Sequence, residues 1–307
     1  MSTYDPVALE CLAAIVEEGG FERAAQRLSV TQSAVSQRLR ALETQVGSVL
    51  IVRSRPLKPT PAGQLLLKHT QQLRLLRTDL ERDLQELAPS AVGGTREDER
   101  ISIAINADSI ATWALAALGD LVREGLPLEI VVDDQDFTQE WLRSGQVLGC
   151  VTTLQQPLRG CKVVPLGAMR YVAVAERGWA ERCLPQGLSP HNFRAVPFVS
   201  FNRKDDIPSD FVARALGLRR VALGQLFVPS SEGQVRAVTA GWGVGVVPEL
   251  LVRPALERGE LVDVAPGHAL AVALYWHCWN LQSQGLDALT RALGAGAAQA
   301  LVCHNTA

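Results

Sequence analysis

The stretch FERAAQRLSVTQSAVSQRLRALE, residues 21–43, reads as two short helices joined by a tight turn. Small apolar residues give the first helix a compact face, formed by Ala24, Ala25 and Leu28. Thr31 lies between the two patterns, and threonine is a residue type that caps a helix N-terminus. The second helix has one apolar stripe at helical spacing, made of Val35, Leu39, Leu42 and Val46. This order predicts a helix-turn-helix motif with residues 32–46 as its recognition helix.

The face of the second helix opposite this stripe carries short or forked hydrogen-bonding groups and almost no carboxylates. Such groups suit base edges and phosphates in the major groove of double-stranded DNA. An ordinary amphipathic surface helix would show the same stripe, but the local charge argues against it. Residues 20–60 hold seven basic side chains against two acidic ones, in a chain whose formal net charge is −2.

Residues 49–60 predict a short hairpin with Arg53 and Arg55 near its tip. A basic wing of this kind would lie over the phosphate backbone or in the minor groove of DNA. The helix-turn-helix and the wing together predict DNA contacts from Thr31, Gln32, Ser33, Ser36, Gln37, Arg38, Arg40, Arg53 and Arg55.

These residues resemble the signature of the LysR-type transcriptional regulators. The resemblance rests on Phe21, Ala24, Ala25, Leu28, the run Thr-Gln-Ser-Ala-Val-Ser at 31–36 and the run Pro-Thr-Pro-Ala-Gly at 59–63. It implies a winged helix-turn-helix domain at residues 1–60, a linker and dimerisation helix at 61–88 and a hinge at 89–99. It also implies a two-lobed, periplasmic-binding-protein-like α/β effector domain at 100–307, with RNA polymerase as a further partner.

Residues 61–87 independently predict one long helix with leucines on one side, of about 40 Å at about 1.5 Å per residue. The leucines recur every seven residues at Leu66, Leu73, Leu80 and Leu87, with Leu76 and Leu84 between them. Such a stripe needs a partner, which we expect to be a second copy in a homodimer or homotetramer. The alternative is that the helix packs against its own chain. His69 and Asp83 interrupt the stripe, so an ideal coiled coil is not expected.

Strand and helix patterns alternate after residue 100, which predicts parallel sheets with helices on their faces. Lobe I is expected at about 100–160 and 267–300, and lobe II at about 161–266, where the pattern restarts near Pro165. We expect Asp108 or Ser109 to cap the helix after the first strand. The Ala- and Gly-rich tail after Gly294 is expected to fray.

Polar residues follow several strands where the cleft between the lobes is expected, because ligands of open parallel sheets bind at the carboxyl ends of strands. Simple helix capping is the alternative explanation for several of them. A helix N-terminus beside carboxylates suits a zwitterion with a basic side chain. The predicted effector-binding residues are Asn106, Asp108, Ser109, Asp133, Thr152, Thr153, Phe201, Asn202, Asp205, Asp206, Ser230 and Ser231.

A second resemblance, to one subgroup of this family, also indicates a ligand with a basic side chain. The runs at 160–161, 165–168, 201–206 and 241–248 are similar to the ArgP/LysG subgroup of these regulators. That similarity implies a sensor of lysine or arginine that controls a basic amino-acid exporter. A LysR-type regulator of another metabolite pathway stays open. So does a solute-binding protein with an accessory helical domain, which would need a secretion signal that the N-terminal residues do not show.

Other function classes find little support in the sequence. No run of about eighteen apolar residues suggests a membrane span, and the six cysteines show no CxxC spacing. The five histidines lack metal-ligand spacing, and no Gly-x-Ser-x-Gly elbow is present. The glycine-rich run at 241–245 follows a predicted helix rather than a strand, unlike a dinucleotide-binding loop. We therefore expect a cytoplasmic protein that is not an enzyme and binds no cofactor or metal.

Overall fold

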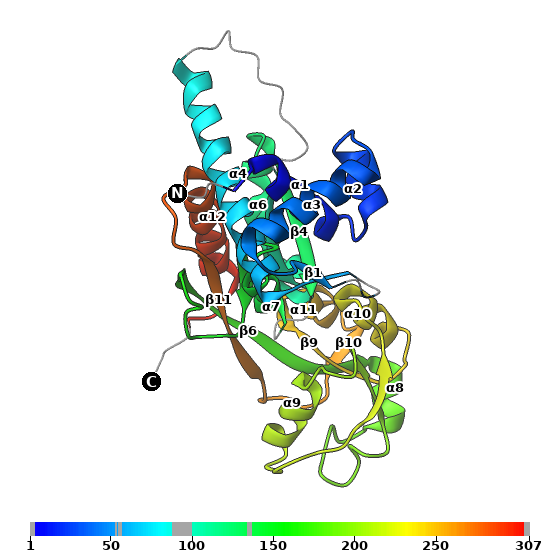
Figure 1. Cartoon of the computed structure of the whole chain (residues 1–307). Helices are drawn as coiled ribbons and strands as arrows, with labels where there is room; N and C mark the ends of the chain where they lie inside the picture. The colour runs from blue at the N-terminus through cyan, green and yellow to red at the C-terminus, as the bar shows by residue number, and fades with distance from the viewer. Residues whose placement is uncertain (1–3, 53, 55–56, 88–99, 134–136, 304–307) are drawn as a thin grey trace.

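The N-terminal helices form a small domain in the computed structural model, which describes residues 4–52, 54, 57–87, 100–133 and 137–303 (Figure 1). Its helices are α1 (Pro6–Glu17), α2 (Phe21–Arg27) and α3 (Gln32–Val46). The Asp5 carboxylate accepts a hydrogen bond from Val7 N at 3.0 Å, and the Thr31 hydroxyl accepts one from Ala34 N at 3.2 Å. These bonds satisfy backbone donors that a helix start leaves unpaired, and the predicted cap at Thr31 is confirmed.

A two-stranded wing follows the recognition helix. Strands β1 (Ile51–Val52) and β2 (Lys58–Pro59) pair antiparallel, with Ile51 opposite Pro59 and Val52 opposite Lys58. The predicted hairpin is therefore confirmed. Arg53 and Arg55, predicted at its tip, lie outside the described residues.

The long helix α4 (Pro61–Leu87) begins where Thr60 caps it, accepting from Gly63 N at 3.1 Å. Its N-terminal half packs on its own chain, whereas its C-terminal half projects away from the body of the molecule (Figure 1). Leu66 and Leu67 are buried in the core of the helix-turn-helix domain, and Leu75 joins the core of the effector domain. The predicted leucine seam is thus wrong at Leu66. Four of its leucines are exposed: Leu73, Leu76, Leu80 and Leu84.

The effector domain is built on one mixed sheet with the strand order β4-β3-β5-β11-β6-β9-β7-β8. Lobe I is the half around β3 (Ile101–Asn106), β4 (Leu128–Asp133) and β5 (Gly149–Thr152). Lobe II is the half around β7 (Pro197–Ser200), β8 (Gly224–Phe227) and β9 (Val244–Pro248), with β10 (Leu261–Asp263) paired to β6. The pairs β3–β4, β3–β5, β7–β8 and β7–β9 are parallel, as predicted for each lobe.

Two long antiparallel strands join the lobes. These are β6 (Cys161–Glu176) and β11 (Leu270–Trp279), which pair with each other and connect the parallel strands of both halves. The predicted restart near Pro165 is therefore wrong, because β6 runs through that position without ending. The register of the two strands shifts between Leu274 and Tyr275, so that Leu274 faces Gly167 and Tyr275 faces Pro165. This bulge accommodates the proline inside the strand.

Helices cover both lobes. The described ones are α5 (Ala107–Ser109), a π-helical turn η2 (Ile110–Ala114), α6 (Leu115–Arg123), α7 (Thr138–Arg143), α8 (Arg177–Cys183), α9 (Ile207–Ala215), α10 (Ser231–Thr239), α11 (Glu249–Glu257) and α12 (Gln284–Ala300). The predicted cap at Asp108 or Ser109 is wrong, since α5 already begins at Ala107 after Asn106. In the described part of the chain, none of the helices combines the length and apolar composition that a membrane crossing requires.

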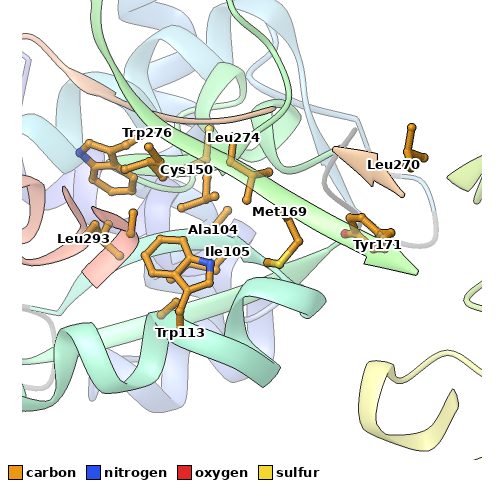
Figure 2. Packing of buried hydrophobic residues seen from close by; sticks show 14 of the residues in the cluster. Ala104, Ile105, Trp113, Cys150, Met169, Tyr171, Leu270, Leu274, Trp276 and Leu293 are labelled. Atoms are coloured by element: carbon orange, nitrogen blue, oxygen red, sulfur yellow. The ribbon is translucent and has the colours of Figure 1, made fainter. Parts of the chain in front are cut away.

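The core of lobe I brings the last helix onto the first. Figure 2 shows Trp113 of η2 packed below the sheet near Met169 and Ile105, with Leu293 of α12 beside Trp276. Ala297 of α12 is fully buried, and a Cβ on Gly296 would lie 2.4 Å from Ala117 Cβ. The predicted fraying after Gly294 is therefore wrong as far as Ala300, because these small residues let α12 approach η2 and α6 closely. Residues 304–307 lie outside the described part.

Candidate DNA-recognition surface and effector pocket

The recognition helix α3 presents the predicted polar surface outward. Its apolar stripe of Val35, Leu39 and Leu42 is buried against α1 and α2. Thr31, Gln32, Ser33, Gln37 and Arg40 are exposed, whereas Ser36 and Arg38 are partly covered. A face that stays open while the stripe opposite is buried can enter a DNA groove.

Two of these side chains also have structural roles. The Thr31 hydroxyl, besides capping α3, lies 2.9 Å from the Ser33 hydroxyl. Arg38 Nη1 lies 4.0 Å from Cys11 Sγ on α1, a distance at which sulfur accepts only weakly. The pKa of the Cys11 thiol is raised by burial, although Arg38 opposes the shift.

A charged network fixes the helix-turn-helix domain on α4. Buried Arg74 of α4 donates through Nε to both carboxylate oxygens of Glu10 at 2.9 and 3.1 Å, and through Nη1 to Glu17 at 2.8 Å. Gln71 Nε2 donates to the same Glu17 oxygen at 2.8 Å. Burial lowers the pKa of Arg74, but Glu10 and Glu17 outweigh it and raise this pKa overall. Charge-assisted pairs of this kind hold two elements in one orientation.

Between the lobes lies a pocket with about 390 Å³ of space, open solvent at its mouth included. Asn106, Ala107 and Asp108 reach it from lobe I. From β6 and lobe II it is lined by Tyr171, Phe201, Asp205, Ile207, Gln234 and Val246. None of the described residues that line it is a lysine, arginine or histidine. The described lining of the pocket therefore holds two carboxylates and no basic side chain.

Asp108 lies partly buried in the pocket wall and is approached by neutral hydroxyl groups. Tyr171 Oη donates a hydrogen bond to Asp108 Oδ2 at 2.6 Å. Figure 2 shows Tyr171 on β6, far from Trp276 of β11. The Ser231 hydroxyl also faces the carboxylate, although it does not reach the geometry of an ordinary hydrogen bond. Burial raises the pKa of Asp108, while Ser231 and Tyr171 only partly oppose the shift.

Three buried oxygens, on two residues close to Asp108 in the chain and on one residue that faces it, have no hydrogen-bond partner in the described part of the chain. They are Asn106 Oδ1, Ser109 Oγ and Ser231 Oγ. Buried polar atoms of folded proteins are usually paired, so such a group at one place indicates that a ligand or water completes them.

Asp205 has a different environment. Its Oδ2 accepts a hydrogen bond from Phe201 N at 2.9 Å, and its Oδ1 accepts one from Ile207 N at 3.1 Å. Both oxygens therefore brace the loop that carries Phe201 and starts α9. Asp205 shapes the pocket wall as well as charging it.

The other predicted effector residues lie outside the pocket lining. Asp133 pairs with Asn106 in the sheet register, but its Oδ2 accepts a hydrogen bond from Trp141 Nε1 at 2.8 Å. Thr152 is buried and donates to Gln139 Oε1 at 3.0 Å, and Thr153 follows it, partly exposed. The ends of β3 and β4 thus lie side by side, as predicted. The side chains of Asp133 and Thr152, however, form hydrogen bonds within lobe I.

In lobe II, too, several predicted effector residues lie outside the pocket lining. Asn202 Oδ1 accepts from Lys204 N at 2.7 Å within its own loop, and Asp206 is exposed at the start of α9. Ser230 caps α10 by accepting from Gly233 N at 3.1 Å. Ser231, the first residue of α10, is not a cap, and its hydroxyl faces Asp108.

Sequence reasoning missed Tyr171, Ile207, Gln234 and Val246. Tyr171 and Val246 lie inside strands, so the rule that ligands bind at strand ends does not select them. Of these four residues, Gln234 could have been found by its pattern, because it is a polar residue on the buried side of α10. A buried amide without an assigned partner is a candidate ligand contact.

A winged helix-turn-helix on a long helix, next to two lobes that enclose a polar pocket, defines a DNA-binding regulator that responds to a small molecule. Residues 7–64 match the family model described as bacterial regulatory helix-turn-helix protein, lysR family. Residues 94–298 match the LysR substrate binding domain. The chain belongs to the LysR family of transcriptional regulators.

Full-length relatives agree with this assignment. The transcriptional regulator ArgP of Pseudomonas aeruginosa is 43% identical over 303 residues, which cover 98% of this chain and 99% of ArgP. The crystal structure of ArgP from Mycobacterium tuberculosis is 39% identical with a TM-score of 0.82, and the match covers 99% of this chain and 100% of that one. Full-length LysG from Corynebacterium glutamicum with bound effector Arg is 33% identical with a TM-score of 0.72, over 97% and 99% of the two chains. The expected resemblance to the ArgP/LysG subgroup is confirmed.

Proposed function

We propose that this regulator senses a basic amino acid, lysine or arginine, in the pocket between its lobes. The observation that carries the proposal is the pocket lining, which holds Asp108 and Asp205 and no basic side chain among the described residues. Phe201, Ile207 and Val246 supply apolar walls suited to a methylene chain. Similarity to LysG, whose structure holds the effector Arg, supports the same ligand class.

The DNA-binding unit of the proposal is a homodimer or a homotetramer. The exposed leucines of α4 form one stripe at helical spacing, and a stripe of this kind is stable in water only when another apolar surface covers it. A second copy of α4 meets that need and gives the two-fold symmetry with which helix-turn-helix proteins read paired half-sites.

DNA contacts are assigned to the exposed face of α3 and to the wing. In this proposal Gln32, Ser33, Ser36, Gln37 and Arg40 meet base edges or phosphates, with Thr31 and Arg38 at the margins of the surface. Arg53 and Arg55, outside the described residues, bind the phosphate backbone. The regulated gene, by similarity to the ArgP/LysG subgroup, encodes a basic amino-acid exporter. RNA polymerase is the further partner, and the cytoplasm is the place of action.

The effector acts, in this proposal, by changing how the two lobes sit on each other. Pocket residues come from both lobes, so a bound amino acid bridges them. Lobe I also touches α4, where Lys68 Nζ lies 3.7 Å from the centre of the Trp279 ring. A change in lobe placement is thereby connected to the helix that carries the DNA-binding domain.

Calorimetric titration of the full-length protein with a panel of amino acids tests the proposal. Lysine or arginine should bind, and neutral or acidic amino acids should not. The same ligand should alter the affinity for the regulated promoter DNA at fixed salt, because LysR-family binding to duplex DNA is salt-dependent. Binding of an acidic or apolar amino acid with no response to lysine or arginine would overturn the proposal.

A further inference from the structure

The acceptors around Asp108 come from both lobes. Asn106 ends β3 in lobe I and Asp108 follows it, whereas Ser231 begins α10 in lobe II. Asn106 is 2% exposed and Ser231 is 3% exposed, yet Asn106 Oδ1 and Ser231 Oγ have no partner among the described residues. These two buried oxygens and the partly buried Asp108 carboxylate can all accept hydrogen bonds.

The two pocket carboxylates are not equivalent. Each oxygen of Asp205 already accepts a backbone N–H, which partly offsets its charge. Asp108 faces two neutral hydroxyls, those of Tyr171 and Ser231, and no described basic side chain pairs with it. A partly buried carboxylate in this state gains more from an incoming cation than one that already accepts backbone hydrogen bonds at both oxygens.

We infer that Asp108 receives the cationic head of the effector's side chain, with Asn106 and Ser231 accepting its remaining N–H groups, and that Asp108 thereby selects a charged head group. The inference rests on the proposed function and assigns the head group to one of the two carboxylates. A guanidinium has five N–H donors in a planar fork, which fits several acceptors spread around one point. The α-amino acid end of the ligand then lies away from Asp108, toward Asp205 and the mouth.

The test compares arginine with citrulline, which has the same α-amino acid end and a neutral head of similar shape. Both ligands are titrated calorimetrically into the full-length wild type and the Asp108→Asn variant. Wild type should bind arginine about tenfold to a hundredfold more tightly than citrulline, the range for hydrogen bonds to a charged group. Asp108→Asn should lose this preference, mainly by weaker arginine binding. Asp210→Asn, an exposed position on α9 outside the pocket, is the control and should keep it.

An unchanged preference in Asp108→Asn would overturn the inference. In that case both ligands would weaken equally, because Asp108 would meet the α-ammonium group that they share. Should Asp108→Asn fail to fold, Ser231→Ala replaces it, since the cap of α10 is Ser230 and is left intact. A few-fold loss of the arginine preference in Ser231→Ala supports the inference, and an unchanged preference overturns it. If the wild type binds neither arginine nor lysine, the proposed function itself is refuted. This outcome differs from failure of the inference, in which arginine binds but the preference over citrulline is unchanged in Asp108→Asn.

Discussion

Gly145 is a point where lobe I closely approaches α4, and replacing it tests whether that contact holds the two together. Its backbone has φ +74°, and an added Cβ would lie 2.7 Å from Lys68 N and 2.8 Å from Lys68 Cα. These are backbone atoms of α4, so they cannot turn aside as a flexible side chain would. Gly145→Ala should therefore push α4 away from lobe I and separate Lys68 from the Trp279 ring.

The expected loss of stability in Gly145→Ala has two contributions. Alanine in the left-handed region costs about 1 kcal/mol relative to glycine. The collision with α4 adds about 1–3 kcal/mol, the usual range for overpacking. Gly125→Ala is a matched control, because Gly125 also follows a helix of lobe I and has φ +91°, but a Cβ there meets nothing within 4 Å. It should cost only the first contribution, about 1 kcal/mol.

Hydrogen exchange of the full-length protein measures the difference where it arises. Amides in the first half of α4 should exchange about fivefold to a hundredfold faster in Gly145→Ala than in the wild type, the factor that corresponds to about 1–3 kcal/mol. In Gly125→Ala they should exchange as in the wild type. Equal exchange of α4 in the two variants would refute the reasoning, because it would show that the docking contact contributes nothing.

Three further predictions concern DNA binding, assembly and pH. Gln37→Ala or Arg38→Ala should weaken specific operator binding by about 1–3 kcal/mol in fluorescence anisotropy at matched salt, and unchanged specific affinity would reject their assigned role. Leu80→Glu should shift the protein toward monomers in sedimentation, because it places a charge in the exposed stripe of α4; an unchanged oligomer would show that this stripe is not the interface. Arginine affinity should rise with pH and level off above the pKa of Asp108, because burial raises this pKa above its usual 3.8 and cation binding must release the proton. Calorimetry in buffers of different ionisation enthalpy measures that proton release, which should be absent in Asp108→Asn.

The short-range features of this fold could be predicted from the sequence, since caps and apolar stripes depend on residues a few positions apart. Thr31 caps α3 as predicted, and Val35 and Leu39 are buried as predicted. Errors arose where a distant partner decides the outcome. Pro165 is typical of a strand end in the sequence, but the register shift against β11 accommodates it inside β6. The tail after Gly294 is typical of a flexible end, but Gly296 packs against Ala117, which is distant in the sequence.

The pocket was predictable in its location but only partly in its lining. Asn106, Asp108, Phe201 and Asp205 lie on it, and all four are at or after the carboxyl end of a strand, β3 or β7. Tyr171 could not be found in this way, because it enters the pocket from a strand shared by both lobes. Its contribution depends on how the lobes are placed, and that placement comes from pairing over long sequence distances.

The contacts along the chain indicate which part moves when the effector binds. Lobe I is tied to α4 at Lys68, and α4 is tied to the helix-turn-helix domain through Arg74, so these parts form one continuous body. Drawing Ser231 toward Asp108 would then move lobe II against that body. Arg74→Met should therefore lower operator affinity by the same factor with and without arginine, because the Arg74 network lies in the part that stays fixed. Anisotropy titrations under both conditions measure the two affinities, and a changed ratio would show that the orientation of the DNA-binding domain on α4 is itself part of the response.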